Sequence, residues 1–319
     1  MADSTSICSF QRRIRCYAVT PDEELFEVLE DVWPEENAVW IQFPSTAEAL
    51  EVLFTEPPDL LLVDDRLEGM KGADVVSLVK SENVYRQLPV VYCLAPELLD
   101  QVSWSKVEAD EFLLLPVDAR EARSRLSLTL CRVSRSLDAN PLTRLPGNTT
   151  IIQRIQDLID AKEEFGLAYV DLDHFKSFND KYGFSRGDEV LLMSARILVN
   201  TVRGIKARYS FVGHVGGDDF VFILPLDIVE QGCAQVVERF DAIVPSFYDP
   251  EDQARGKIVS KDRQGKTREF PLMAVSIAVV ANREAKLEHF GQASEIAMAL
   301  KKKAKENPKS CYVLDRRHG

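Results

Sequence analysis

The chain has 319 residues and carries 51 Asp and Glu against 39 Lys and Arg, a formal net charge of −12. Its length is roughly twice that of a typical domain, so we expect two domains. The acidic balance excludes a general binder of nucleic acid or of anionic membranes, because both classes need a basic surface. A nucleotide stays compatible with this charge, since a local lysine cluster and a metal ion can meet its phosphates.

The sequence contains no pattern of a membrane or export signal. No apolar run reaches the ~18–20 residues needed to cross a bilayer, and the N-terminal residues lack the apolar core of a signal peptide. The six cysteines lie far apart, without metal-ligand spacing. We therefore expect a cytoplasmic protein with buried, reduced thiols and no membrane span.

In the first half, short apolar runs alternate with segments that repeat apolar residues at helical spacing. Strands that alternate with helices at this interval predict parallel βαβ units and a doubly wound sheet. We expect an α/β, flavodoxin-like domain over residues 13–118, after a tail at 1–12. Its strands are predicted at Ile14–Val19, 38–43, Asp59–Asp65, Pro89–Leu94 and Glu111–Leu115.

Residues 119–138 are predicted to form a helical linker or stalk. Leu126, Leu130, Val133 and Leu137 recur at spacings of four, three and four residues, the seam of a coiled coil. Two heptads fit equally well to one amphipathic helix packed on its own domain. Both interpretations stay open at this point.

The second half mixes hairpins and helices and is typical of an α+β domain over residues 139–319. Gly216-Gly217 marks a tight turn between two strands within Ser210–Pro225. The lysines at 301–303 are interpreted as a solvated helix end favoured by the helix dipole. The other predicted elements are helices at Thr149–Ile159, Gly187–Val202, Val229–Ile243 and Gln292–Lys305, and strands at Phe165–Asp173, Lys257–Lys261, Phe270–Val280 and the C-terminal CYVLD.

Two acidic groups lie where strands end or turn. Asp171 and Asp173 end an apolar strand, and Asp218 and Asp219 follow the glycine pair. Carboxylates on two neighbouring strands can hold Mg²⁺ together with nucleotide phosphates, and glycine lets a phosphate approach the main chain. The alternative is an ordinary hairpin turn, which also favours Gly and Asp.

The segments LTRLPGN, DLDHFKSFNDKYGFSRGD and GGDDF occur in this order and closely resemble the motifs of the GGDEF family, the diguanylate cyclases. The resemblance covers about Asp138 to Arg317. It implies a palm-like α+β fold similar to nucleotide cyclases and polymerases. It also implies an enzyme that condenses two GTP molecules into cyclic di-GMP and releases two pyrophosphates, working as a homodimer with Mg²⁺ or Mn²⁺.

The resemblance assigns roles to the acidic residues by position. Asp171 and the backbone carbonyl of Leu172 match metal ligands. Asp218 matches the second carboxylate ligand and the group that helps deprotonate the attacking 3′-hydroxyl. Asp219 stands where the family usually has Glu, and it is a further catalytic and metal-binding candidate.

Substrate contacts follow from the same resemblance. Asn179 and Asp188 match the pair that reads the guanine edge, and Lys176 matches a catalytic lysine that steadies charge on the phosphates. AKENPKS resembles the lysine-rich phosphate contact of the family, which indicates Lys305 and Lys309.

The sequence also departs from the family pattern. Asp219 is one methylene shorter than Glu, and Phe184 occupies a substrate-binding position where His is common. Ala207 and Ser210 replace the charged residues of the product-inhibition motif, so we expect no tight binding of cyclic di-GMP at that surface. The alternative function is therefore a catalytically impaired domain that binds nucleotide or docks a protein. The enzyme is preferred, because the other matched positions are retained.

The first half resembles a response-regulator receiver, since PDLLLVDDRLEGMKG fits the phosphoacceptor strand and places Asp64 at the acceptor position. The acidic metal pair of receivers is replaced by Thr20 and Pro21. The positions of the switch Thr and of the Lys before Pro carry Leu94 and Leu115. An aspartate without these partners has little means of neutralising an incoming phosphoryl group. We expect an unphosphorylated pseudo-receiver used for dimerisation or for docking a protein partner.

Overall fold

The computed structural model of the chain describes residues 13–82, 85–261 and 267–315. The chain divides into two compact units, Met1–Leu137 and Asp138–Gly319. Within the described ranges no helix is both long and apolar enough to span a bilayer. The predicted tail at 1–12 lies outside the described residues.

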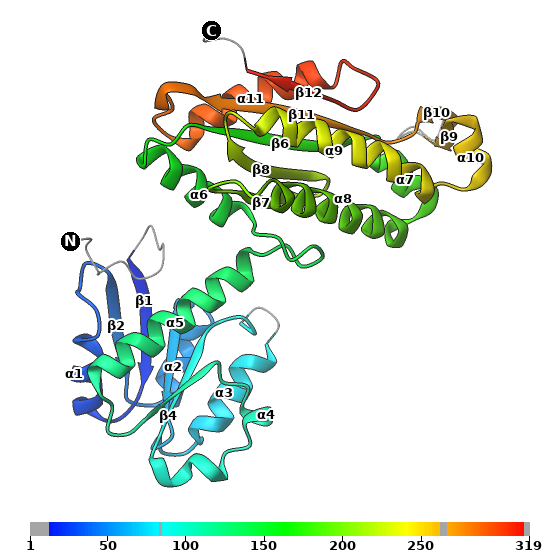
Figure 1. Cartoon of the computed structure of the whole chain (residues 1–319). Helices are drawn as coiled ribbons and strands as arrows, with labels where there is room; N and C mark the ends of the chain where they lie inside the picture. The colour runs from blue at the N-terminus through cyan, green and yellow to red at the C-terminus, as the bar shows by residue number, and fades with distance from the viewer. Residues whose placement is uncertain (1–12, 83–84, 262–266, 316–319) are drawn as a thin grey trace. The chain divides into compact units, whose positions relative to one another are not determined.

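In the described part of the N-terminal unit, five parallel strands form one sheet in the order β2-β1-β3-β4-β5 (Figure 1). This order is that of flavodoxin-like doubly wound sheets, so the sheet is compatible with the predicted fold class. The strands are β1 (Ile14–Val19), β2 (Ala38–Phe43), β3 (Leu60–Asp64), β4 (Val90–Leu94) and β5 (Glu111–Leu114).

Apolar side chains fill both faces of this sheet, which explains why its central strands read as continuous hydrophobic runs. Asp22 and Ser45 cap the first two helices, each accepting a hydrogen bond from a backbone N–H in the first turn. The connections contain α1 (Glu23–Glu30), α2 (Thr46–Leu53), α3 (Gly72–Ser81), the 3₁₀ helix η1 (Pro96–Gln101) and α4 (Trp104–Val107).

The first half of helix α5 (Ala119–Asp138) packs into the core of the N-terminal unit, to which it belongs. Leu126 and Leu130 are buried in the core around β1, whereas Leu137 is 58% exposed. Of the two interpretations left open for this segment, packing on its own domain therefore applies to the first of its heptads.

In the described part of the C-terminal unit, the main sheet has the order β12-β11-β6-β8-β7. The central strand β6 (Phe165–Asp173) is antiparallel to both β8 (Asp219–Pro225) and β11 (Ala274–Asn282). At the edges, β7 (Phe211–Gly216) pairs antiparallel with β8, and β12 (Cys311–Leu314) pairs parallel with β11. Strand β6 thus lies between two strands, β8 and β11, that come later in the chain.

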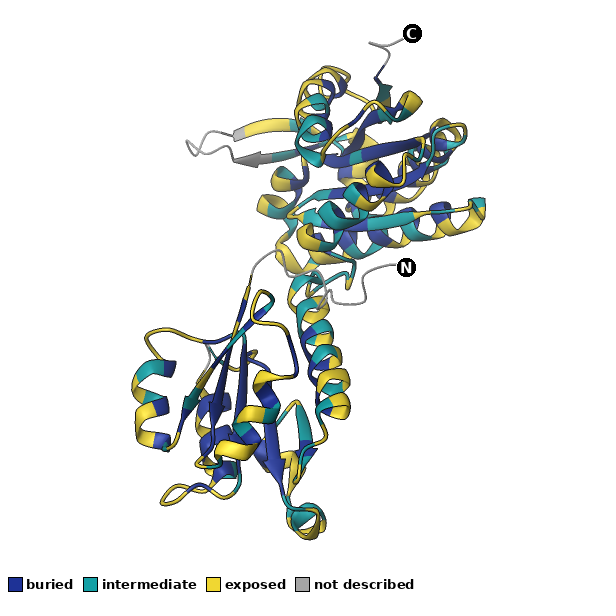
Figure 2. Cartoon of the chain, turned by 90° about the vertical axis from the view of Figure 1, so that its left-hand side faces the viewer, coloured by how far each residue is buried: buried dark blue, intermediate teal, exposed yellow. Residues whose placement is uncertain are grey.

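Helices cover both faces of this sheet, and their inward sides are the buried ones in Figure 2. One face packs against α6 (Asn148–Asp160) and α11 (Phe290–Ala304). The other packs against α7 (Phe175–Tyr182), α8 (Phe184–Ile205) and α9 (Val229–Ile243). The remaining elements are η2 (Val244–Phe247), α10 (Pro250–Arg255), β9 (Lys257–Lys261), β10 (Thr267–Pro271) and η3 (Arg283–Ala285).

The structure corrects several predicted boundaries. The strand predicted at Phe270–Val280 is two strands, because β10 ends at Pro271, which has no N–H to donate to a ladder. The strand predicted at Lys257–Lys261 is β9, and a helix that was not predicted, α10, precedes it. Helix α7 was not predicted, and α8 begins at Phe184 instead of Gly187.

Cysteine chemistry matches the prediction in part. Cys16, Cys93 and Cys233 are buried free thiols, and burial raises the pKa of each. Cys311 is a partly buried free thiol. Cys131 is disulfide-bonded, so the expectation of reduced thiols is wrong at that residue.

Candidate functional site

The acidic residues of the second half meet at one end of the central strands of the sheet. Asp171 on β6 is directly opposite Asp219 on β8 and, on its other side, opposite Ser276 on β11. Asp171 is only 4% exposed. On the β8 side the ladder ends at this pair, so Leu172 and Asp173 extend beyond it. The Ser276 hydroxyl donates a hydrogen bond to Asp173.

A glycine turn carries Asp218 to the same end of the sheet. Gly216 has φ +148° and Gly217 has φ +58°, backbone conformations that favour glycine. Nothing lies within 4 Å of the positions where a Cβ would be at either residue. The turn therefore favours glycine for its backbone, and the space beside both glycines is open.

Helix α11 brings two ammonium groups to these carboxylates. Lys301 Nζ lies 2.7 Å from Asp171 Oδ2 and also pairs with Asp219 Oδ1. Lys305, one helical turn later, places its Nζ 2.7 Å from Asp171 Oδ1. Lys305 was a predicted phosphate contact, whereas Lys301 was expected to be a solvated helix end. The i, i+4 spacing of the two lysines was the sequence signal that could have placed them on one face.

The surroundings shift the pKa values of the three carboxyls in different directions. Burial disfavours the charge of Asp171, but the ammonium groups of Lys301 and Lys305 lower its pKa overall. Burial, with a smaller contribution from the negative charge of Asp171, raises the pKa of Asp218. Burial also raises the pKa of Asp219, although Lys301 opposes the shift. The two lysines pair with Asp171 and Asp219, so within the described residues no ion pair balances the negative charge of Asp218.

The carboxylates at this end of the sheet offer oxygen donors to a divalent cation. Among residues 13–82, 85–261 and 267–315, no three His, Cys, Asp or Glu side chains form a ready-made metal cluster. The predicted ligand set differs from such a cluster, since it contains two carboxylates and a backbone carbonyl. Asp218, half-buried and repelled by Asp171, makes no ion pair within the described residues. Hard oxygen donors in this arrangement suit Mg²⁺ or Mn²⁺.

The predicted guanine-reading residues lie on α7 and at the start of α8. The Oδ1 atom of Asn179 is buried and has no hydrogen-bond partner within the described residues. It lies against Gly187, where an added Cβ would be only 1.8 Å away. Asp188, the next residue, is exposed. Sequence reasoning missed this close approach of Gly187 to Asn179, because it depends on contact between two helices.

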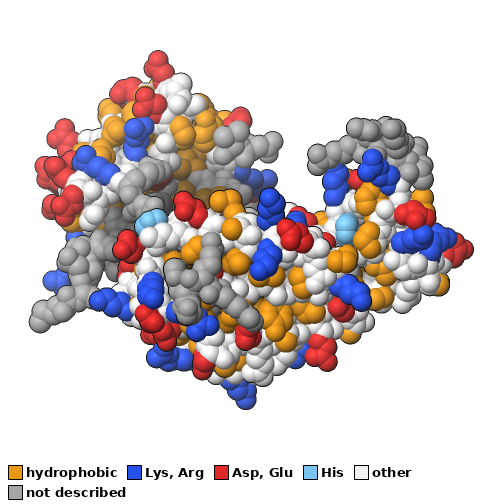
Figure 3. All heavy atoms as spheres, turned by 90° about the horizontal axis from the view of Figure 1, so that it is seen from above, with side chains coloured by type: hydrophobic (Ala, Val, Ile, Leu, Met, Phe, Trp, Pro, Cys, Tyr) orange, Lys and Arg blue, Asp and Glu red, His pale blue; other side chains and the backbone are white. Residues whose placement is uncertain are grey.

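The other predicted substrate contacts lie at the surface. Lys176 and Asp188 are exposed, and Phe184 is 80% exposed at the start of α8. Lys309 is exposed, and in the described part of the chain its side chain forms no ion pair. On the face drawn in Figure 3, Lys and Arg side chains are interspersed with Asp and Glu and form no continuous basic patch.

A buried histidine joins the glycine turn to the segment that precedes α6. His214 is 3% exposed and stacks on Phe220, with ring centroids 4.2 Å apart. Its Nε2 lies 3.0 Å from the carbonyl oxygen of Gly217, and its Nδ1 lies 2.9 Å from the Thr143 hydroxyl. A neutral ring satisfies both contacts when Nε2–H donates to Gly217 and Nδ1 accepts from Thr143. His214 and Thr143 were also missed, since 71 residues separate them.

We expect the contribution of the His214 ring to stability to decrease as the pH falls. Burial lowers the pKa of His214, so in acid the unfolded chain takes up a proton before the folded one. Stability from the neutral ring is complete above about pH 6.5 and is lost below it. His214→Gln should therefore destabilise the C-terminal unit more at pH 7.5 than at pH 5.5. Urea unfolding followed by circular dichroism measures this, with the exposed His289→Gln as control. An equal effect at both pH values would contradict the expectation.

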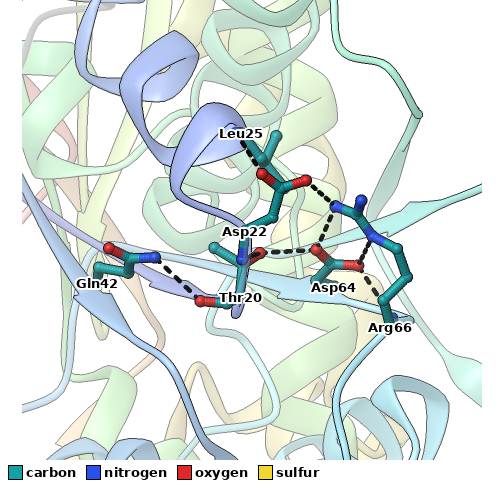
Figure 4. Close-up of polar contacts among 6 residues, drawn as sticks. All are labelled: Thr20, Asp22, Leu25, Gln42, Asp64 and Arg66. Atoms are coloured by element: carbon teal, nitrogen blue, oxygen red, sulfur yellow. Dashed lines mark hydrogen bonds and ion pairs between the residues drawn. The ribbon is translucent and has the colours of Figure 1, made fainter.

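The N-terminal unit holds a second acidic site, drawn in Figure 4. Asp64, at the end of β3, is fully buried. The Thr20 hydroxyl donates to Asp64 Oδ2 over 2.7 Å. Arg66 donates from Nε to Oδ1 over 3.0 Å and from Nη2 to Oδ2 over 2.7 Å. The carboxylate is thus held by a two-point guanidinium pair, the strong geometry for this interaction.

Arg66 also reaches Asp22, whose Oδ2 lies 2.7 Å from Nη2. Hydrogen bonding to Asp64 is the main cause that raises the pKa of Arg66. One guanidinium therefore spans the two acidic side chains at this end of the sheet. Sequence reasoning placed Asp64 at the acceptor position but did not predict this internal cation.

Comparisons with known proteins identify the relatives of this chain. The diguanylate cyclase DgcP of Pseudomonas aeruginosa is 33% identical over 109 residues, covering 33% of this chain and 16% of DgcP. The response regulator PleD of Caulobacter vibrioides is 25% identical over 213 residues, covering 61% of this chain and 46% of PleD. This chain thus spans less than half the length of either relative.

Solved structures with similarity include the coiled coil and GGDEF domain of DgcB from Caulobacter crescentus in complex with c-di-GMP. It is 22% identical with a TM-score of 0.45, and the match covers 62% of this chain and 96% of that one. The family model described as "Diguanylate cyclase, GGDEF domain" matches residues 138–308, more than half of the chain. The chain therefore belongs to the GGDEF family of diguanylate cyclase domains.

Proposed function

We propose that the C-terminal unit, within residues 139–319, condenses two GTP molecules into cyclic di-GMP with release of two pyrophosphates. The observation that carries this proposal is the pairing of Asp171 and Asp219 with the ammonium groups of Lys301 and Lys305, beside the glycine turn that carries Asp218. In-line attack on an α-phosphate needs positioning and charge neutralisation more than covalent catalysis. Carboxylates and lysines on rigid strands and a helix supply both.

The carboxylates have separate roles in the proposed reaction. Asp171, the carbonyl of Leu172 and Asp218 would hold Mg²⁺ or Mn²⁺, with Asp219 beside them. When bound, the ion acidifies the 3′-hydroxyl and neutralises charge on the phosphoryl oxygens. Asp218 would also accept the proton of the hydroxyl, since the glycine turn holds it at the same end of the sheet as Asp171.

Guanine recognition is assigned to Asn179 and Asp188. Asn179 carries amide donors and an acceptor that can pair with a base, and its side chain would turn to do so, because Oδ1 is buried against Gly187 in this structure. The exposed Asp188 carboxylate can accept from the ring N–H and the exocyclic amine of guanine, a combination that adenine lacks. Lys176, Lys305 and Lys309 would contact the phosphates, and Phe184 would border the nucleotide.

Gly187→Ala tests this assignment. The new Cβ would lie 1.8 Å from Asn179 Oδ1, so the Asn179 side chain must move. Losing one hydrogen-bond partner of the base should raise KM for GTP by roughly tenfold, with a smaller change in kcat. Gly204→Ala, on the same helix with nothing within 4 Å, is the matched control and should leave KM unchanged. Equal KM values for both variants would reject the guanine assignment.

The active enzyme is proposed to be a homodimer in the cytoplasm. One chain offers one GTP site, so two chains must face each other to join two nucleotides. The N-terminal unit is proposed to be a pseudo-receiver that supports this pairing or docks a protein partner. Arg66 already neutralises Asp64, which supports an acceptor position that is not phosphorylated. Intact-mass analysis after incubation with acetyl phosphate should show no phosphorylated Asp64.

The alternative is a catalytically impaired domain that binds nucleotide or protein. Its support is the ion pair between Asp219 and Lys301, which engages the shortened carboxylate of the GGDDF turn. Incubation of the full chain with GTP and Mg²⁺, followed by chromatography, separates the two functions. We expect cyclic di-GMP from GTP and no cyclic product from ATP. GTP binding without product at high protein concentration would favour the alternative.

A further inference from the structure

We propose that Lys301 is an internal counter-cation of the metal-binding carboxylates, which keeps the divalent-ion affinity of the site low until a nucleotide binds. The inference rests on the proposed function of the same site and adds a regulatory role for a residue outside the predicted set. It predicts that metal and nucleotide bind cooperatively, with Lys301 moving from carboxylate to phosphate.

The contacts of Lys301 place its charge between two strands. Its Nζ pairs with Asp171 on β6 and with Asp219 on β8, which are directly opposite each other in the sheet. The side chain of Lys301 is 30% exposed, and that of Asp171 is 6% exposed. The ammonium group therefore lies where a cation bound by this end of the sheet would be expected.

Each oxygen of Asp171 lies 2.7 Å from an ammonium nitrogen, Oδ2 from Lys301 and Oδ1 from Lys305. Among the described residues, Oδ1 has this ion pair but no hydrogen-bond partner. A divalent ion that takes Asp171 as a ligand must displace at least one ammonium group. Lys301 is the stronger competitor, because its ammonium group contacts two carboxylates. The cost of separating these charges lowers the affinity for the ion.

The contacts are specific to Lys301 within a run of three lysines. Lys302 and Lys303 are exposed and form no ion pair within the described residues. Lys301 and Lys305 are four residues apart, so they share the face of α11 that meets the sheet. The run thus supplies one inward lysine and two neighbours with the same chemistry as internal controls.

A nucleotide changes the balance of charge. Its phosphates offer the released ammonium group a new anionic partner, so the cost of leaving the carboxylates is recovered. The nucleotide therefore strengthens ion binding, and by linkage the ion strengthens nucleotide binding by the same factor. In wild type this coupling passes through Lys301.

Lys301→Met tests the inference, because Met keeps an unbranched apolar stem with good helix propensity and removes the charge. The readout is Mn²⁺ affinity of the full chain without nucleotide, from the electron paramagnetic resonance signal of free Mn²⁺. We expect Lys301→Met to bind Mn²⁺ about tenfold more tightly than wild type, since one competing charge is gone. Lys301→Arg, which keeps the charge, should stay within about twofold of wild type.

Lys302→Met is the matched control for the change in net charge and should leave the affinity unchanged. Adding Asp171→Asn to Lys301→Met should remove the tight site, which places the ion at these carboxylates. With a GTP analogue that carries a methylene between the α- and β-phosphorus atoms, the tenfold gap between wild type and Lys301→Met should shrink below about threefold. Circular dichroism spectra verify that each variant is folded.

Equal Mn²⁺ affinities of wild type and Lys301→Met, or an equal gain in Lys302→Met, would overturn the inference. A gap that persists with the analogue would overturn the movement to phosphate. The test needs no turnover, so it is separate from the proposed activity. Tight Mn²⁺ binding by Lys301→Met without any cyclic di-GMP would reject the activity alone. Cyclic di-GMP production with equal affinities would reject only the role of Lys301.

Discussion

Asp218→Asn lowers the initial rate of cyclic di-GMP formation by at least about 1000-fold, which is the largest effect we expect in this protein. The substitution preserves the size of the side chain and removes its negative charge. Asp218 is the carboxyl of the glycine turn that forms no ion pair within the described residues. Its charge is thus free for the metal and for the 3′-hydroxyl proton, and both roles are lost together. Chromatographic quantification of product from GTP and Mg²⁺ measures the rate.

Asp227→Asn is the matched control for this variant. Asp227 is exposed and follows the opposite end of β8, two residues after Pro225. It carries the same charge in the same unit but lies far along the strand from the glycine turn, so its rate should stay within about twofold of wild type. A rate for Asp218→Asn within tenfold of wild type would show that the carboxylate is dispensable and would favour the nucleotide-binding alternative.

Arg66→Ala destabilises the N-terminal unit by about 2 kcal/mol, the largest effect on stability that we expect. The substitution leaves the fully buried Asp64 without its guanidinium, and an uncompensated buried charge costs several kcal/mol. Arg66 itself is 45% exposed, so water reaches part of the site and the figure is reduced accordingly. All Trp residues of the chain (Trp33, Trp40 and Trp104) belong to this unit. Urea unfolding followed by Trp fluorescence therefore reports on it selectively.

Two further variants establish why Arg66→Ala is expected to lose stability. Arg86→Ala removes an exposed pair with Glu108, at 3.8 Å, and should change the stability by less than about 0.5 kcal/mol. Asp64→Asn combined with Arg66→Ala leaves no charge to desolvate and should recover part of the loss. An Arg66→Ala variant as stable as wild type, or a double variant less stable than both single ones, would contradict the role of Arg66 as the internal cation of Asp64.

Local patterns in the sequence were sufficient to predict much of the secondary structure. The alternation of apolar runs and helical segments predicted each strand of the N-terminal sheet to within a few residues, because burial on both faces requires continuous apolar strands. The GGDDF turn and the strand ending at Asp173 were likewise located, since glycine and strand-end carboxylates are recognisable without their neighbours. Membership of the GGDEF family followed from motifs in a fixed order and is shown by the match over residues 138–308.

Which charged side chains contact each other depends on the tertiary structure. Lys301 and Asp219 are 82 residues apart, and their contact depends on how α11 packs on the sheet. Thr143 and His214 meet through a loop that lies against β7, and Arg66 reaches Asp22 from a loop that follows a different strand. Helix propensity and residue spacing are properties of neighbours in the chain, whereas an ion pair depends on distances set by the packing of whole elements. Sequence motifs therefore indicated the family of the protein. Tertiary packing determined which of three consecutive lysines contacts the carboxylates.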